Sequence, residues 1–160
     1  MSVQRIAVVG AGTMGNGIAH VAAQHGKDVL LVDVVPDALE RAVGTIAKNL
    51  ERQVKKGVLD EAARGAALAR IRTTTDLAEA AARAELVIEA VPEKAELKYA
   101  VAEAVDRAAP AEALLATNTS SISITEIAAR TRRPDRVIGM HFMNPVPLMK
   151  LVEVIRGIAT

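Results

Sequence analysis

The amino-acid sequence predicts an α/β fold, a doubly wound and mostly parallel β-sheet covered by helices on both faces. Short apolar runs alternate with alanine-rich segments of helical periodicity along the chain, which is typical of βαβ units. The runs are continuously apolar, as expected for parallel strands buried on both faces. A length of 160 residues suits one domain, so we expect residues 1–160 to form a single unit.

The predicted elements follow one another at short intervals. Strands are expected at residues 6–9, 29–32, 71–74, 86–88, 114–116 and 137–140, and the run 71–74 is the weakest candidate. Helices are expected at residues 14–26, 37–56, 60–70, 76–82, 93–108 and 123–130.

Local signals support these helices. Pro92 precedes the segment 93–108, where its missing N–H costs little, and a Ser/Thr-rich stretch before Thr125 offers several N-caps. The segment 37–70 is long for a single crossover, so it predicts a helical-hairpin insertion broken near residues 57–60.

The C-terminal run 148–155 predicts a last strand, antiparallel to residues 136–141. The connection of about eight residues is too short for a parallel crossover. In a hairpin centred on Pro147, His141 and Glu153 lie opposite each other, because each is six residues from that proline. We therefore expect Glu153 to be buried beside the imidazole.

Composition excludes several classes of function. A net charge of +1 gives no reason to expect nucleic acid or an anionic membrane as a partner, and with one Tyr and one Phe there is no base-stacking platform. The absence of cysteine rules out disulfides and thiolate chemistry, and the three histidines are too dispersed for a metal site. No run approaches the ~18 apolar residues of a membrane span and no signal peptide is apparent, so the expected location is cytoplasmic.

The stretch "RIAVVGAGTMGNGIAH" contains a Gly-x-Gly-x-x-Gly motif between a predicted strand and a predicted helix. This context is the one in which the motif binds a dinucleotide, with the pyrophosphate at the helix N-terminus. The alternative is a glycine loop that only makes a turn. The candidate cofactor-binding residues of the loop are Gly10, Gly12, Thr13, Met14 and Gly15.

Asp33 ends the second predicted strand, about twenty residues after the glycine loop. Its carboxylate can accept hydrogen bonds from both ribose hydroxyls of an adenosine, and it would repel a 2′-phosphate. No Arg stands next to it in the sequence. These features favour NAD over NADP and a Rossmann-type fold.

Other polar residues also follow the ends of predicted strands. Glu89, the stretch 117–121 and His141 would meet Asp33 at the carboxyl edge of a parallel sheet, where open α/β folds bind ligands. Each has a simpler interpretation. Asn118 and Ser120 could cap a helix, and the remaining candidates could lie on exposed helix surfaces: Glu93, Lys98 and Lys56.

His141 and Glu153 would form a catalytic pair. A carboxylate at one ring nitrogen fixes the tautomer and makes the other nitrogen a better proton acceptor. An NAD-dependent alcohol oxidation needs such a base, and Asn118 and Ser120 could bind the oxygen that becomes a carbonyl. The alternative is an ion pair that only ties two strands together.

Four motifs, "VVGAGTMGNGIA", "EAVPEKAELK", "TNTSSISITEIA" and "GMHFMNPVPLMKLVEV", together resemble the L-3-hydroxyacyl-CoA dehydrogenase family, which includes 3-hydroxybutyryl-CoA dehydrogenases. The resemblance implies reversible, NAD-dependent oxidation of the 3-hydroxyl of an acyl-CoA. It implies that His141 is the base and Glu153 its partner, and that Ser120 contacts the substrate oxygen. It places other candidates near the nicotinamide ribose, the adenosine ribose or the acyl-CoA: Asn118, Glu93, Lys98, Asp33, Asn144 and Lys56.

Members of that family usually continue with an all-helical domain that closes the substrate site and forms the usual homo-oligomer contact. We expect that domain to be absent from residues 1–160, so that the chain binds NAD but turns over acyl-CoA slowly. Two alternatives remain open: a dehydrogenase of a free sugar acid or hydroxy acid, and a non-catalytic NAD-binding structural protein.

Overall fold

A seven-stranded sheet in the order β3-β2-β1-β4-β5-β6-β7 organises the chain, and the structure, a computed structural model, describes residues 2–160. Neighbouring strands are parallel except β6 and β7, which are antiparallel. The doubly wound, mostly parallel sheet predicted above is therefore confirmed. The strands are β1 (Arg5–Val9), β2 (Asp28–Val32), β3 (Ile71–Thr74), β4 (Leu86–Glu89), β5 (Leu114–Thr117), β6 (Val137–Phe142) and β7 (Val152–Arg156).

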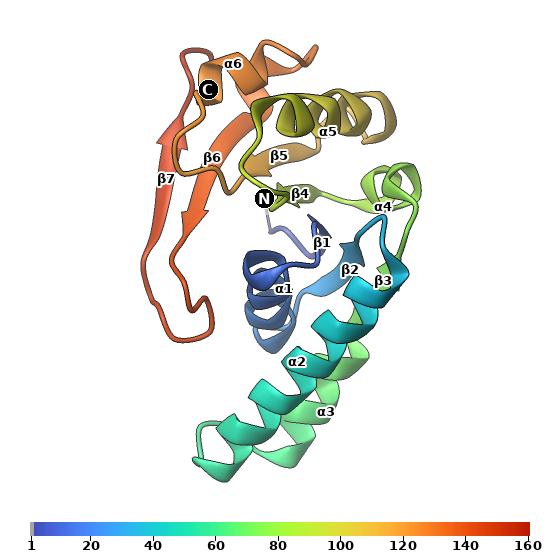
Figure 1. The fold of residues 1–160 in the computed structure, drawn as a ribbon, viewed down its shortest axis with the longest axis vertical. Helices are drawn as coiled ribbons and strands as arrows, with labels where there is room; N and C mark the ends of the chain where they lie inside the picture. The colour runs from blue at the N-terminus through green and yellow to red at the C-terminus, as the bar shows by residue number, and fades with distance from the viewer. Residues whose placement is uncertain (1) are drawn as a thin grey trace.

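Helices cover both faces of this sheet, and two of them extend beyond it (Figure 1). The extended pair, α2 and α3, lies side by side as an arm, which confirms the predicted hairpin. The turn between them has Gly57 at φ 72°, and the Asp60 side chain caps α3 by accepting the Ala63 amide at 2.7 Å. The helices are α1 (Thr13–Gln24), α2 (Pro36–Lys55), α3 (Glu61–Ala69), α4 (Leu77–Arg83), α5 (Ala95–Ala108), α6 (Ile124–Ala128) and a 3₁₀ turn at Pro134–Arg136.

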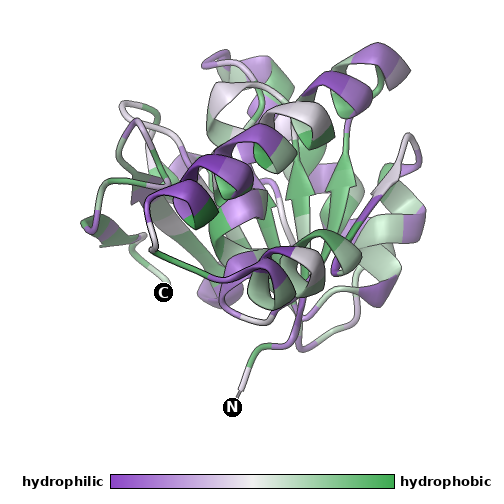
Figure 2. Ribbon diagram, turned by 90° about the horizontal axis from the view of Figure 1, so that it is seen from below, coloured by the Kyte–Doolittle hydropathy of each residue, from purple (hydrophilic) through white to green (hydrophobic). Residues whose placement is uncertain are grey.

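The core lies on both sides of the sheet. In β1, Ile6 and Val8 pack into one apolar cluster, whereas Ala7 and Val9 pack into the other. Figure 2 shows the hydrophobic strands between helices that carry hydrophilic and hydrophobic residues in alternation. Burial on both faces is the physical reason that the strands are continuously apolar. Within residues 2–160, no helix is long and apolar enough to cross a membrane.

Several predicted boundaries are wrong by two residues or more, among them the ends expected at residues 26 and 140, which lie at Gln24 and Phe142. The helix expected at 93–108 begins at Ala95, because the chain turns at Pro92, whose carbonyl accepts the Lys94 amide at 2.7 Å. The helix expected at 123–130 spans only Ile124–Ala128. The last strand begins at Val152 instead of residue 148, because the amides of residues 148 and 149 both donate to the Pro145 carbonyl and curl the chain.

The connection between β6 and β7 packs against α1. A Cβ atom at Gly17 would lie 2.8 Å from the Cβ of Val146, which is itself buried. The absence of a side chain at Gly17 thus lets this connection approach the helix.

Gly17→Ala should destabilise the protein by about 1–3 kcal/mol, because the added methyl group forces Val146 outwards. Gly44→Ala is the matched control, since Gly44 is an exposed position of α2 with no neighbouring atom within 4 Å of an added Cβ. It should stabilise the protein by roughly 0.5–1 kcal/mol through helix propensity. Urea unfolding of both variants measures the two effects, and equal effects would contradict this packing.

Candidate functional site

A cavity of about 800 Å³ lies at the carboxyl edge of the sheet. We call it the main cavity; it is lined by the loop before α1, the end of β2, the first turns of α2 and the loops after β4 and β5. Most of the residues predicted for a dinucleotide site line this cavity: Gly10, Gly12, Thr13, Met14, Asp33, Glu93, Lys98, Asn118 and Ser120.

The glycine loop fits a phosphate group. Gly10 has φ 102° and lies against the β4–α5 loop, so that an added Cβ would lie 2.7 Å from the Ala90 carbonyl oxygen. Gly12, the N-cap of α1, has open space around it and no side-chain cap, and the first turn of α1 contains no acidic residue. The amides and partial positive charge of this helix end are therefore available to an anion.

Gly15 does not line the main cavity but explains how the loop is built. A Cβ at this position would overlap the Gly10 carbonyl oxygen and lie 3.7 Å from the Val8 side chain. The helix can therefore pack onto the strand only with glycine here, as the motif predicts.

Asp33 lines the main cavity and holds the glycine loop against the loop that follows β2. One carboxylate oxygen accepts the Ala11 amide at 2.8 Å and the other accepts the Val35 amide at 3.0 Å. No arginine is next to Asp33 in the sequence, but the fold brings Arg41 of α2 into the same cavity. The signal for Arg41 is its helical spacing: it lies on the α2 face that also carries Ala38, one turn earlier.

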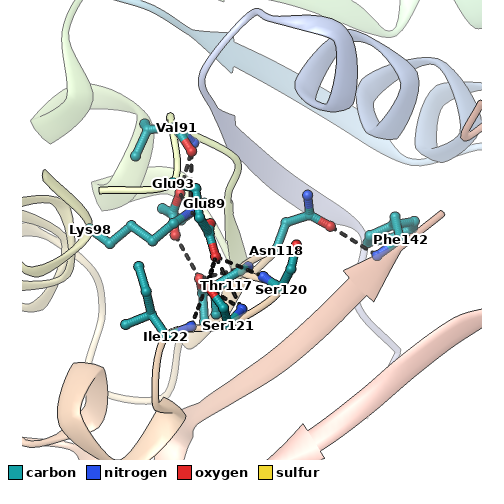
Figure 3. Close-up of polar contacts among 11 residues, drawn as sticks. Glu89, Val91, Glu93, Lys98, Thr117, Asn118, Ser120, Ser121, Ile122 and Phe142 are labelled. Atoms are coloured by element: carbon teal, nitrogen blue, oxygen red, sulfur yellow. Dashed lines mark hydrogen bonds and ion pairs between the residues drawn. The ribbon is translucent and has the colours of Figure 1, made fainter. Parts of the chain in front are cut away.

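Glu93 joins the two loops that follow β4 and β5. Its Oε1 accepts hydrogen bonds from the hydroxyl of Thr119 and from the amides of Ser120 and Ser121, at 2.9 and 3.1 Å respectively for the amides (Figure 3). Burial by itself would raise the pKa of Glu93, but the Thr119 hydroxyl, the Ser120 amide and the Lys98 charge lower it to about 2. The sequence placed Thr119 and Ser121 at this edge within the stretch 117–121, but it did not predict their contact with Glu93, which comes from another loop.

Lys98 and Glu89 form a buried ion pair next to the main cavity. The Lys98 ammonium lies 2.8 Å from Glu89 Oε1, and the side chains are 1% and 3% exposed. Lys98 also lines the main cavity, whereas Glu89 does not. The expectation that Glu89 opens onto the crevice with the other strand ends is therefore wrong.

His141 and Glu153 face each other across β6 and β7, as predicted from the hairpin geometry. His141 Nδ1 lies 2.7 Å from Glu153 Oε2. Glu153 is not buried as expected: its side chain is 51% exposed and that of His141 is 24% exposed, because β7 is the edge strand of the sheet. With Nδ1 engaged, Nε2 is the ring nitrogen that can exchange a proton with a ligand.

The His141 pair lies one strand beyond the main cavity. His141 does not line that cavity, but Asn118 does, and its side-chain oxygen accepts the Phe142 amide at 2.9 Å. Asn118 therefore connects the main cavity to the strand that carries His141. The expectation that these strand-end residues meet in one crevice is therefore wrong for His141 as well as for Glu89.

A second cavity of about 480 Å³, the arm groove, lies between α1, α2 and the β6–β7 connection. Its lining includes Arg52 and Lys56 together with the apolar residues Val58 and Leu148. The predicted substrate residue Lys56 is therefore in a groove, whereas Asn144 is exposed in the connection and lines neither cavity.

His20 forms part of the wall of the arm groove. Its ring is buried, and Nε2 lies 3.0 Å from the Gln24 oxygen and 3.3 Å from the Gln53 oxygen. Burial lowers the pKa of His20, so the ring is neutral at neutral pH. No group of three or more His, Asp or Glu side chains within residues 2–160 is arranged to hold a metal ion.

Glu93→Gln should lower the melting temperature at neutral pH, and the difference from wild type should shrink as the pH falls. Because the folded-state pKa of Glu93 is depressed to about 2 from 4.5, its stabilising contribution is present above pH 4.5 and is lost as the pH falls towards 2. Thermal unfolding of both proteins across this range measures the difference. A difference that stays constant from pH 6 to pH 2 would contradict this role of the ionised carboxylate.

Comparison with known proteins places this geometry in a family. The family described as "3-hydroxyacyl-CoA dehydrogenase, NAD binding domain" matches residues 5–160. The 3-hydroxybutyryl-CoA dehydrogenase of Bradyrhizobium diazoefficiens is 52% identical over 99% of this chain and 54% of its own length. A probable 3-hydroxybutyryl-CoA dehydrogenase of Bacillus subtilis is 49% identical over 100% of this chain and 55% of its own. The chain thus spans about half the length of these relatives.

A solved structure of a relative has the same fold as this chain. The crystal structure of 3-hydroxybutyryl-CoA dehydrogenase from Escherichia coli superimposes with a TM-score of 0.97 at 49% identity, covering 100% of this chain and 34% of that one. The chain belongs to the 3-hydroxyacyl-CoA dehydrogenase family, and residues 5–160 are its NAD-binding domain.

Proposed function

We propose that this chain takes part in the NAD-dependent interconversion of 3-hydroxyacyl-CoA and 3-ketoacyl-CoA thioesters. The observation that carries the proposal is the His141–Glu153 pair, at 2.7 Å, beside a cavity that fits a dinucleotide. Relatives that match the whole chain are named for this chemistry. The pair is at the edge of the sheet where an open α/β fold binds its ligands.

In the proposed reaction, His141 Nε2 accepts the proton of the substrate 3-hydroxyl. Glu153, at Nδ1, keeps the ring in the tautomer that leaves Nε2 free and stabilises the imidazolium that forms. Bound NAD supplies the acceptor for the hydride that leaves the same carbon. In the reverse direction His141 returns the proton to the oxygen.

Ser120 and Asn118 orient the substrate in this proposal. Both line the main cavity, and the Ser120 amide is held by Glu93 at 2.9 Å. With the backbone of Ser120 held in this way, its hydroxyl can donate a hydrogen bond to the substrate oxygen as that oxygen gains carbonyl character. We assign Asn144, exposed three residues after His141, to contact with the acyl part.

The arm groove suits the coenzyme A part of the substrate. Arg52 and Lys56 supply positive charge for phosphate groups, and Val58, Pro147 and Leu148 supply apolar surface for the linking chain. A free hydroxy acid has no group that would use this groove. The groove therefore supports a thioester substrate over the free-acid alternative.

His141→Gln should reduce turnover of acetoacetyl-CoA and NADH by about 100- to 10 000-fold, because the proton donor is lost. Glu153→Gln should reduce it by roughly 10- to 100-fold, because the ring loses its orienting carboxylate. Neither change should alter the Kd for NADH, which is read from NADH fluorescence with little background because the chain has no Trp. His25→Gln, at an exposed histidine, is the control.

The proposal fails if wild type gives no NADH signal at millimolar cofactor. It also fails if His141→Gln retains wild-type turnover. Wild-type turnover by the 160-residue chain, followed as loss of NADH absorbance, is the reference for both variants.

Lys56→Ala should weaken binding of free coenzyme A by roughly three- to tenfold, because one phosphate contact is lost. Lys55→Ala is the matched control: Lys55 pairs with Glu51 at 2.8 Å and does not line the arm groove. Isothermal titration with coenzyme A distinguishes the two variants. An equal effect of both changes, or no binding by wild type, would favour the free-acid alternative.

A further inference from the structure

The buried ion pair between Glu89 and Lys98 is an unusual feature for the centre of a sheet. Their side chains are 3% and 1% exposed, and β4, which ends at Glu89, lies between β1 and β5. Removing two charges from water is costly, and well-packed apolar residues often stabilise a fold equally well or better. The pair therefore calls for an explanation other than stability.

Glu89 connects three separate elements. Its Oε1 accepts the Lys98 ammonium at 2.8 Å and the Val91 amide at 2.7 Å, while Oε2 accepts the Thr117 hydroxyl at 2.6 Å. One carboxylate thus ties α5, the loop after β4 and the end of β5 together, as Figure 3 shows.

Lys98 extends this network towards the main cavity. Its ammonium also donates to the Val91 carbonyl at 3.1 Å and lies 3.4 Å from Glu93 Oε2. Two hydrogen bonds, to Glu89 and to the Val91 carbonyl, and one longer ion pair with Glu93 thus hold the ammonium group. Glu93 in turn holds the Ser120 amide at 2.9 Å.

The loop after β4 also touches the glycine loop. A Cβ atom at Gly10 would lie 2.7 Å from the Ala90 carbonyl oxygen, so the two loops approach this closely only because residue 10 is glycine. A displacement of this loop would therefore disturb the phosphate cradle as well as Ser120.

We propose that Glu89 is a positioning residue for the cofactor site: by holding Lys98 and the Val91 amide, it sets the β4–α5 loop against the glycine loop and, through Glu93, orders Ser120. Glu89 itself does not line the main cavity and acts only through these neighbours. The inference rests on the proposed function in that the cavity binds NAD(H).

Glu89→Gln should weaken NADH binding by about tenfold, because it removes a charged hydrogen-bond acceptor and leaves Lys98 to pull Glu93 away from Ser120. Asp106→Asn is the matched control, since Asp106 is a buried carboxylate at the other end of α5, held by Arg132 and Arg133 at 2.9 Å each. It should lower the melting temperature and leave the Kd for NADH within about twofold of wild type.

A double variant separates positioning from stability. Glu89→Gln combined with Lys98→Met removes both buried charges and should recover part of the melting temperature lost in Glu89→Gln alone. NADH binding should remain weak, because the ion pair between Lys98 and Glu93 Oε2 is lost. Thr117→Val, which removes only the donor to Oε2, should weaken NADH binding by roughly two- to fivefold.

NADH fluorescence titration and thermal unfolding of the five proteins decide the question. Wild-type affinity in Glu89→Gln, or recovery of both stability and affinity in the double variant, would overturn the inference. If Glu89→Gln does not fold, unchanged binding by Thr117→Val would overturn it instead. Failure of wild type to bind NADH would contradict the proposed function, and this result differs from all of these.

Discussion

The coverage of the sheet by helices on both faces is the constraint on which the rest of the structure depends. It leaves strand residues such as Val8 and Val87 without solvent contact, and in the central strands β1 and β4 the polar residues Arg5 and Glu89 stand at the ends. In the parallel part of the sheet the carboxyl ends share one edge, so Asp33 and Asn118 from different strands line one cavity. The location of the site therefore follows from the burial of the strands.

The antiparallel strand β7 adds a second region to that edge. It brings Glu153 to His141 at the border of the sheet, and Asn118 links this border to the main cavity through the Phe142 amide. In the proposed reaction the main cavity binds the cofactor, and His141, at the border of the sheet, transfers the proton. The His141–Glu153 pair is more exposed than Glu89 and Lys98, because β7 is the edge strand and β4 lies in the middle of the sheet.

Sequence alone predicted the sheet, the arm and the glycine loop, because each depends on local periodicity or on backbone requirements within a few residues. The His141–Glu153 contact was also predictable, since a short hairpin fixes its own register. The exposure of Glu153 was not, because it depends on which strand forms the edge. The Glu89–Lys98–Glu93 network joins residues of a strand, a loop and a helix, and only the packing of α5 against the sheet reveals it.

Helix α2 forms a wall of both cavities. Arg41 and Thr45 line the main cavity, and Asn49 and Arg52 line the arm groove further along the same helix. The helix thus sets the spacing between the two cavities, because Thr45 and Asn49 are separated by about one turn, roughly 6 Å along the axis. A single inserted residue between them would rotate one wall by about 100° relative to the other. The length of this helix is therefore under a geometric constraint that its apolar stripe alone would not impose.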